Sequence, residues 1–354
     1  MRLLRDVRDI PYDRTGERLP MILDVDTGID DTLALIYAAA HPDIDLAGVT
    51  CVAGNVPLDD VVHNTLGVLE TAGRTDVEVA AGAAGPVARP LETTPETHGP
   101  HGIGYAQVSP TTTVSDRHAV DLIVETARRR PGEVTLVTLG PLTNLAAAVL
   151  AEPRLPLLLR DVFIMGGTFF EAGNAAPRVE WNIHVDPEAA KIVFHRWSAC
   201  AEEGAAPLTV MGLDVTETSR IDASGLADVA RACGLPVAAD DDVAIMSTAF
   251  GDPLLDLVRD SLRFYFEFHE TADGFYGAHI HDPFVVGAAL DPSLIHTRAT
   301  VVDVQLGGAM TDGETVADWR GHLDKGVNAR VAVAGDGAAF GERLRSLLAD
   351  AASL

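Results

Sequence analysis

Four aspartates stand close together where an apolar run gives way to a helical pattern. They are Asp24, Asp26, Asp30 and Asp31, in the stretch MILDVDTGIDDTLAL. Acidic residues favour the first turn of a helix, which accounts for Asp30 or Asp31 but not for the two aspartates in the preceding strand. Carboxylates that converge at one strand end repel each other, and a hard cation with oxygen ligands removes that penalty. The stretch therefore predicts a calcium or magnesium site.

A second candidate lies in the stretch GAHIHDPFVVGAAL, which holds His279, His281 and Asp282. Asp282 followed by Pro283 has the form of a helix N-cap with proline at the first helical position. The two histidines are two residues apart, so in an extended segment they share a face. Because His281 directly precedes a possible metal ligand, it becomes a candidate for acid–base chemistry.

A third candidate is the stretch GNAAPRVEWNIHV, which shows no helical period. A polar surface loop is one interpretation of it. The alternation of EWN, however, places Glu180 and Asn182 on one side of an extended segment, with Asn174 nearby. An amide and a carboxylate that point the same way suit the binding of a diol or polyol.

Alternating strand and helix patterns must position these residues. Apolar runs of strand length occupy 21–26, 45–54, 77–83, 134–140, 161–167 and 208–216, and helical patterns occupy 30–42, 57–74, 116–130 and 186–197. This alternation predicts an α/β fold with an open, mostly parallel (mixed) sheet flanked by helices, in which ligands bind beyond the carboxyl ends of the strands.

The organisation of the chain follows from the same patterns. We expect residues 1–19 to form an N-terminal extension and 20–354 to form a single domain. The stretch 83–116 is rich in Gly, Pro and Thr and is too long for a plain connection, so we expect a functional loop there.

The composition indicates which kinds of binding partner and which cellular compartment to expect. The formal net charge of −26 argues against nucleic acid and against an anionic membrane, and suits an uncharged small molecule. No stretch is long and apolar enough to span a membrane, and the first twenty residues lack the apolar centre of a signal peptide. Cys51, Cys200 and Cys233 have no metal-site or disulfide spacing, so the cytoplasm is expected.

The motifs taken together resemble the inosine-uridine-preferring nucleoside hydrolase family. The motifs follow one another in the family's order over residues 20–290. They are DVDTGIDD, CVAGN, LVTLGPLTN, IMGG with GN, EWN and DPEAA, and finally HDP. The resemblance implies a nucleoside-hydrolase-type fold that hydrolyses the N-glycosidic bond of ribonucleosides to ribose and free base. It also implies a bound calcium ion and, we expect, a homodimer or homotetramer.

The resemblance carries roles to individual residues. It implies calcium ligands at Asp26, Asp31, the carbonyl of Leu139 and Asp282. It implies that Asp26 is the general base that activates water and His281 the acid for the leaving group. It implies substrate contacts at Asp30, Asn55, His98, Met165, Asn174, Glu180, Trp181 and Asn182. Asp24 resembles a support of the loop.

The chain departs from the family pattern in places that leave the substrate open. Trp181 stands where many members have phenylalanine. The resemblance is loosest over 263–280, where Tyr265, His269 and Tyr276 are candidates for base contacts. Preference for purine or pyrimidine and tolerance of a modified ribose therefore remain open.

Two other functions fit parts of the pattern. A DxD at the end of a first strand also begins haloacid-dehalogenase-like phosphatases, but these need a downstream basic residue, and the only lysines are Lys191 and Lys325. A non-catalytic nucleoside- or pentose-binding protein would keep the sugar contacts but lack the base and the acid.

Overall fold

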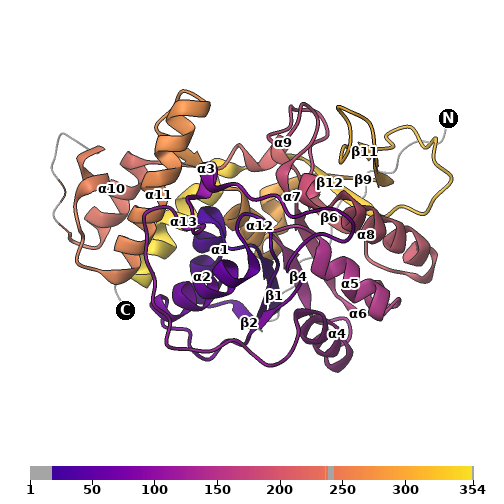
Figure 1. Ribbon diagram of the computed structural model, residues 1–354, viewed down its shortest axis with the longest axis horizontal. Coiled ribbons are helices and arrows are strands. Elements are labelled where there is room, and N and C mark those ends of the chain that lie inside the picture. The colour runs from indigo at the N-terminus through magenta and orange to yellow at the C-terminus, as the bar shows by residue number, and fades with distance from the viewer. Residues whose placement is uncertain (1–17, 236, 238–242, 353–354) are drawn as a thin grey trace.

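An eight-stranded sheet forms the centre of the computed structural model, which describes residues 18–235, 237 and 243–352 (Figure 1). Its strand order is β3 (Val79–Ala81), β2 (Ile44–Cys51), β1 (Leu19–Val25), β4 (Thr135–Thr138), β5 (Asp161–Met165), β6 (Leu208–Met211), β12 (Ala329–Gly335) and β9 (Ile295–Thr300). All neighbouring pairs are parallel except β12 and β9, which are antiparallel. The predicted mostly parallel, mixed sheet is confirmed.

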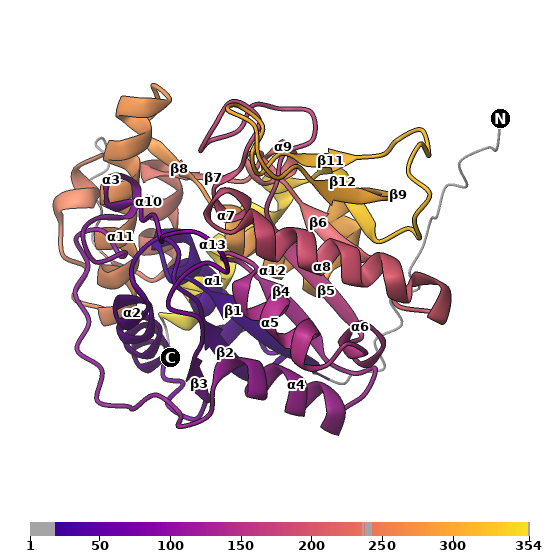
Figure 2. The same cartoon turned by 45° about the vertical axis from the view of Figure 1, so that its right-hand side comes forward.

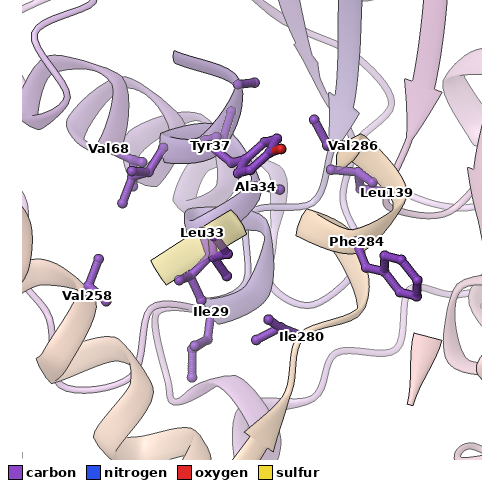
Figure 3. Packing of buried hydrophobic residues seen from close by; sticks show 14 of the residues in the cluster. Ile29, Leu33, Ala34, Tyr37, Val68, Leu139, Val258, Ile280, Phe284 and Val286 are labelled. Carbon is purple, nitrogen blue, oxygen red and sulfur yellow. The ribbon is translucent and has the colours of Figure 1, made fainter. Parts of the chain in front are cut away.

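Side chains of the central strand β1 alternate between two hydrophobic cores. Met21, Leu23 and Val25 point into one core, and Ile22 points into the other. Because every residue of β1 is buried, both faces of the sheet are covered. Figure 3 shows side chains of the first core, among them Ile29 and Leu33 from one helix and Phe284 from another.

Helices cover both faces of the sheet (Figure 2). The first core is covered by α1 (Ile29–Ala40), α2 (Leu58–Thr71), α10 (Ala223–Ala232), α11 (Pro253–Ala272), α12 (His281–Leu290) and α13 (Gly337–Ala351). The second is covered by α4 (Ala119–Arg129), α5 (Thr143–Ala151), α6 (Leu155–Leu158) and α8 (Pro187–Cys200). None of the described helices combines the length and the apolar character needed to cross a membrane.

Short elements complete the part of the chain that the structure describes. They are α3 (Pro95–His98), α7 (Trp181–Val185), α9 (Leu213–Thr216), the pair β7 (Arg220–Asp222) and β8 (Gly277–His279), and the pair β10 (Val302–Val304) and β11 (Thr315–Ala317). Three 3-10 turns span Ala201–Glu203, Val243–Ser247 and Pro292–Leu294.

Most of the predicted elements agree with the structure, but several stretches differ. The run 208–216 is not one strand, because β6 ends at Met211 and α9 follows it. The sheet begins at Leu19, the last residue of the predicted extension, and residues 1–17 of that extension lie outside the described residues. Residues 83–116 are mostly irregular, as predicted, but contain the single turn α3.

Candidate active site

A cavity of about 920 Å³ opens at the carboxyl ends of the strands. It is lined by residues that follow β2, β4 and β5 in the chain, as expected for an open parallel sheet. Most of the predicted site residues meet in this cavity. These are Asp30, Asn55, His98, Leu139, Met165, Asn174, Glu180, Trp181, Asn182, His281 and Asp282.

Three buried carboxylates lie together at this cavity. Asp30, Asp31 and Asp282 each offer an oxygen, and these atoms all lie within 4.8 Å of one another. The two elements that carry them are the first turns of α1 and α12, which belong to the same core. Of the predicted calcium ligands, Asp31 and Asp282 belong to this group, and Asp30 joins them.

Burial and mutual repulsion make these carboxylates costly to ionise. Burial, followed by the charge of Asp31, raises the pKa of Asp30 to about 8. Burial raises the pKa of Asp31 to about 6 and that of Asp282 well above the usual carboxyl range. A bound cation favours the ionised form, so the cluster is a place where the chain could hold a metal ion.

Asp26 is buried beside the carboxylate cluster and is not one of its three members. It is 1% exposed, and one of its carboxylate oxygens, Oδ2, accepts a hydrogen bond from the backbone amide of Asn55 at 2.8 Å. The other, Oδ1, is buried with no hydrogen-bond partner, as is Oδ1 of Asp31. Buried carboxylate oxygens without a donor fit oxygen ligands of a hard cation.

The Asp26 carboxylate occupies space that is free only because two neighbouring residues are glycines. A Cβ atom at Gly54 would lie 2.2 Å from Oδ2 of Asp26, and one at Gly140 would lie 2.8 Å from Oδ1. Both glycines belong to loops that follow strands, after β2 and after β4. Any side chain at either position would therefore displace this carboxylate.

Asn182 is oriented by the strand ends beneath it. Its side-chain Nδ2 donates to the carbonyl oxygen of Leu139 at 2.6 Å and to that of Met165 at 3.3 Å. Because Nδ2 faces these acceptors, Oδ1 is the atom left for the cavity that Asn182 lines. The predicted carbonyl ligand Leu139 thus already accepts one hydrogen bond.

The sequence pattern predicted an extended segment around Glu180, and this prediction is wrong, because a helix begins there. Glu180 is the N-cap of α7, and its carboxylate accepts hydrogen bonds from the backbone amides of Asn182, Ile183 and Gly167 at 2.8, 3.1 and 2.9 Å. Burial raises its pKa to about 7. A five-residue helix is too short to show a period in the sequence, yet its capping still brings Glu180 and Asn182 to one cavity.

A hydrogen bond joins the side chain of Asn174 to the backbone of Trp181. The side-chain Oδ1 of Asn174 accepts a hydrogen bond from the amide of Trp181 at 2.9 Å. The indole Nε1 of Trp181 is buried without a partner, although the residue lines the cavity. This N–H is therefore a donor that the protein leaves unused.

His281 contacts a residue that the sequence did not single out. The ring atom Nδ1 lies 2.8 Å from the hydroxyl of Thr216, in the turn α9. Burial and the neighbouring His279 hold the pKa of His281 well below its usual value, so its ring is neutral. Helix α12 begins at His281, so Asp282 lies inside the first turn and is not the N-cap that its proline neighbour suggested.

His98 serves both the fold and the cavity. Its Nδ1 accepts a hydrogen bond from the amide of Ile29, at the start of α1, at 3.1 Å. Burial lowers its pKa to about 3, so the ring is neutral and Nε2 carries the proton. The ring also lies 5.4 Å from that of Tyr265, centroid to centroid.

Asp24 is separate from the cavity. Its Oδ1 accepts hydrogen bonds from the Thr50 hydroxyl at 2.6 Å and from the Asn144 amide at 2.8 Å. These bonds tie β1 to β2 and α5, which agrees with the predicted supporting role.

The cavity wall also includes residues that the sequence did not identify. Of the three candidates in 263–280, Tyr265 and His269 line it but Tyr276 does not. Phe268 lines it as well and also packs against the first core. Further lining residues without an earlier prediction are Thr94, Glu96, Thr97, Glu171, Glu217, Arg220, Asp273 and Phe275. The composition of 83–116 pointed to the first three, and no local pattern marked Glu217 or Arg220.

Comparisons with known proteins agree with this geometry. The sequence model of the family described as inosine-uridine preferring nucleoside hydrolase matches residues 21–342. The pyrimidine-specific ribonucleoside hydrolase RihA of Shigella boydii is 35% identical over 93% of this chain and 98% of its own. The inosine-uridine preferring nucleoside hydrolase of Leishmania major is 36% identical over 88% of this chain and 92% of its own.

Solved structures show the same fold. A purine-preferring ribonucleoside hydrolase from Gardnerella vaginalis superposes with a TM-score of 0.82 at 29% identity, covering 94% of this chain and 99% of the other. A plant nucleoside hydrolase superposes with a TM-score of 0.80 at 31% identity, covering 95% and 99%. These matches favour the hydrolase over the phosphatase and the binding protein. The chain belongs to the inosine-uridine preferring nucleoside hydrolase family, and it is a hydrolase that acts on N-glycosyl compounds.

Proposed function

We propose that the protein hydrolyses the N-glycosidic bond of ribonucleosides in a calcium-dependent reaction. The observation that carries this proposal is the group of buried carboxylates Asp30, Asp31 and Asp282, of which Asp30 and Asp282 line a cavity with many polar side chains. Oxygen donors without nitrogen or sulfur ligands suit calcium better than zinc. When bound, calcium orients the ribose hydroxyls and the attacking water and makes that water more acidic.

The residues of the chain divide the reaction between them. The water oxygen bonds to the anomeric carbon while the bond from that carbon to the base nitrogen breaks. Asp26 takes the proton released by the water, and its burial, which raises its pKa well above the usual carboxyl value, makes its ionised form a stronger base. Positive charge develops on the sugar as the base leaves, and the Oδ1 dipole of Asn182 stabilises it.

The leaving base needs a proton. Nδ1 of His281 lies 2.8 Å from the Thr216 hydroxyl, which can accept a hydrogen bond from Nδ1 when the ring is protonated. The protonated form of His281 gives its Nε2 proton to the departing nitrogen and returns to the neutral ring that burial favours, and the water proton taken by Asp26 later restores it. His98, whose Nε2 carries a proton, lines the same cavity.

The ribose contacts complete the proposal. We assign Asn55, Asn174, Glu180 and Asn182 to the sugar hydroxyls, with Met165 beneath the ring and Trp181 beside it; all of these line the cavity. Asp30 lines the cavity as well and contacts a sugar hydroxyl from the carboxylate cluster, while Asp26, Asp31, the carbonyl of Leu139 and Asp282 would hold the calcium ion. The relatives include enzymes named as pyrimidine-specific and as purine-preferring, so both kinds of base belong in the test. We further propose a cytoplasmic homodimer or homotetramer, and the free thiols of Cys51, Cys200 and Cys233 fit a reducing compartment.

The test is release of reducing sugar from a panel of purine and pyrimidine ribonucleosides, with calcium and with a chelator. Calcium-dependent release of ribose from any of them supports the proposal, and the rates rank the bases. No release from any nucleoside by protein shown to bind calcium would contradict it. The same panel with Asp31→Asn, which removes one buried carboxylate from the cluster, should give no calcium response.

A further inference from the structure

A second group of ligand-forming side chains lies in the wall of the cavity. His269, Asp273 and His279 each offer one atom, and these atoms all lie within 4.8 Å of one another. His269 and Asp273 come from the end of α11, and His279 from β8. The two histidines are 5% and 7% exposed, whereas Asp273 is exposed. All three line the cavity.

Both imidazoles present a nitrogen that can bind a metal. Nδ1 of His279 lies 2.9 Å from the carbonyl oxygen of Glu217, which can only accept, so Nδ1 carries the proton and Nε2 presents a lone pair. Nδ1 of His269 lies 2.6 Å from a carboxylate oxygen of Asp273, so these two atoms lie side by side where both can ligate one ion. Imidazoles that bind metals in proteins almost always have a partner, such as the Glu217 carbonyl of His279, behind their other nitrogen.

The surroundings favour the neutral, metal-binding form of both rings. Burial lowers the pKa of His269, and burial followed by the charge of His269 lowers the pKa of His279 to about 4, so both rings are neutral and their lone pairs free. Of the charged neighbours, Asp273 favours a cation here, while Arg220, whose guanidinium lies 5.0 Å from the centre of the Phe275 ring, opposes one.

We propose that His269, Asp273 and His279 form a second metal site, which takes a divalent transition-metal ion such as Zn²⁺. Two imidazoles and a carboxylate are the ligands that Zn²⁺ accepts, with a fourth position open to the cavity, whereas the all-oxygen cluster of Asp30, Asp31 and Asp282 suits calcium. The rings of His279 and His281 are 5.8 Å apart, so an ion at this site blocks the place of the leaving base. This inhibitory consequence rests on the proposed function, but the binding of the ion does not.

The test measures Zn²⁺ binding to the full chain saturated with calcium, by titration calorimetry. We expect one Zn²⁺ per chain, and we expect His279→Ala and Asp273→Asn each to weaken its binding by at least about tenfold. Asp273 is exposed, so its variant keeps the fold even if a buried histidine variant does not. The matched control is His101→Ala, which removes an exposed histidine paired with Asp60 at 3.4 Å and should leave Zn²⁺ binding unchanged.

Two further measurements complete the test. Co²⁺ added to the calcium-loaded protein should show the visible absorption of nitrogen-coordinated cobalt, and His279→Ala should remove it. Zn²⁺ should slow ribose release in the parent protein, and this inhibition should weaken in Asp273→Asn when each variant is compared with its own zinc-free rate. Zn²⁺ binding that is absent, or equal in the parent, His279→Ala and Asp273→Asn, would overturn the proposal even if ribose release were normal.

Discussion

The backbone amide of Asn55 donates a hydrogen bond of 2.8 Å to Oδ2 of Asp26, while Oδ1 of the same carboxylate is buried without a partner. The bond holds the Asp26 side chain in one orientation. The free oxygen is then available to a cation or to a water molecule. The loop after β2 thus positions a carboxylate that belongs to the end of β1.

Replacing Asp26 by Asn should abolish turnover. The amide keeps the shape of the side chain but cannot accept a proton from water, so we expect ribose release to fall by at least about 10²-fold. Calorimetry should show weaker calcium binding. Asp59→Asn, on the exposed start of α2, is the control and should behave like the parent. Rates near those of the parent would remove Asp26 from the mechanism.

Substituting Gly54 by Ala tests whether space around Asp26 is required. The new Cβ would lie 2.2 Å from Oδ2, so the carboxylate must move, and we expect calcium affinity to fall by about 10–100-fold. Gly341→Ala, in α13, is the matched control because its Cβ would meet nothing closer than 3.5 Å. Equal calcium affinity in both variants would contradict this account of the Asp26 position.

Stability in the absence of calcium should depend on pH. The folded pKa values of Asp31 and Asp30 are about 6 and about 8, above the unfolded value of about 4. From about pH 4 to about pH 8 the folded state therefore binds more protons than the unfolded state. Stability of the calcium-free protein therefore falls as pH rises from about 5 to about 8. Calcium should raise Tm more at the upper end, because it binds the ionised carboxylates. Thermal unfolding with calcium and with chelator across this range measures both trends, and parallel curves would be evidence against the cluster as the calcium site.

Asn182→Ala should lower kcat more than it raises KM. Its Oδ1 faces the cavity because Nδ2 is held by the carbonyl oxygens of Leu139 and Met165, and this dipole is worth most when the sugar carries positive charge. We expect kcat to fall by about 10²-fold, from steady-state kinetics on the best ribonucleoside. A change confined to KM would show that Asn182 only binds the ground state.

His281→Ala should slow substrates in proportion to their need for a leaving-group proton. Ribonucleosides should lose about 10²–10⁴-fold in rate, whereas aryl ribosides with activated leaving groups should lose little. Thr216→Val, which removes the hydroxyl 2.8 Å from Nδ1, should produce a smaller loss of the same kind. If both variants slowed the two substrate classes equally, the acid role of His281 would be wrong.

Local patterns in the sequence were sufficient for the main elements. Strands and helices differ in the period of their apolar residues, so β1, α1, β2 and α2 could be placed within a few residues. Polar residues at successive strand ends then indicated where the cavity would open, because the carboxyl ends of parallel strands meet at one edge of the sheet. The ordered motifs were enough to place the chain in its family.

The tertiary structure decided which of these residues touch. Asp30 joins Asp31 and Asp282, and Thr216 meets His281, through contacts between segments far apart in the chain that no local period encodes. The short helix α7 replaced an expected extended segment because its single turn is fixed by the cap at Glu180, not by periodicity. Burial, which sets the pKa of each carboxylate, likewise exists only once both hydrophobic cores have closed around the sheet.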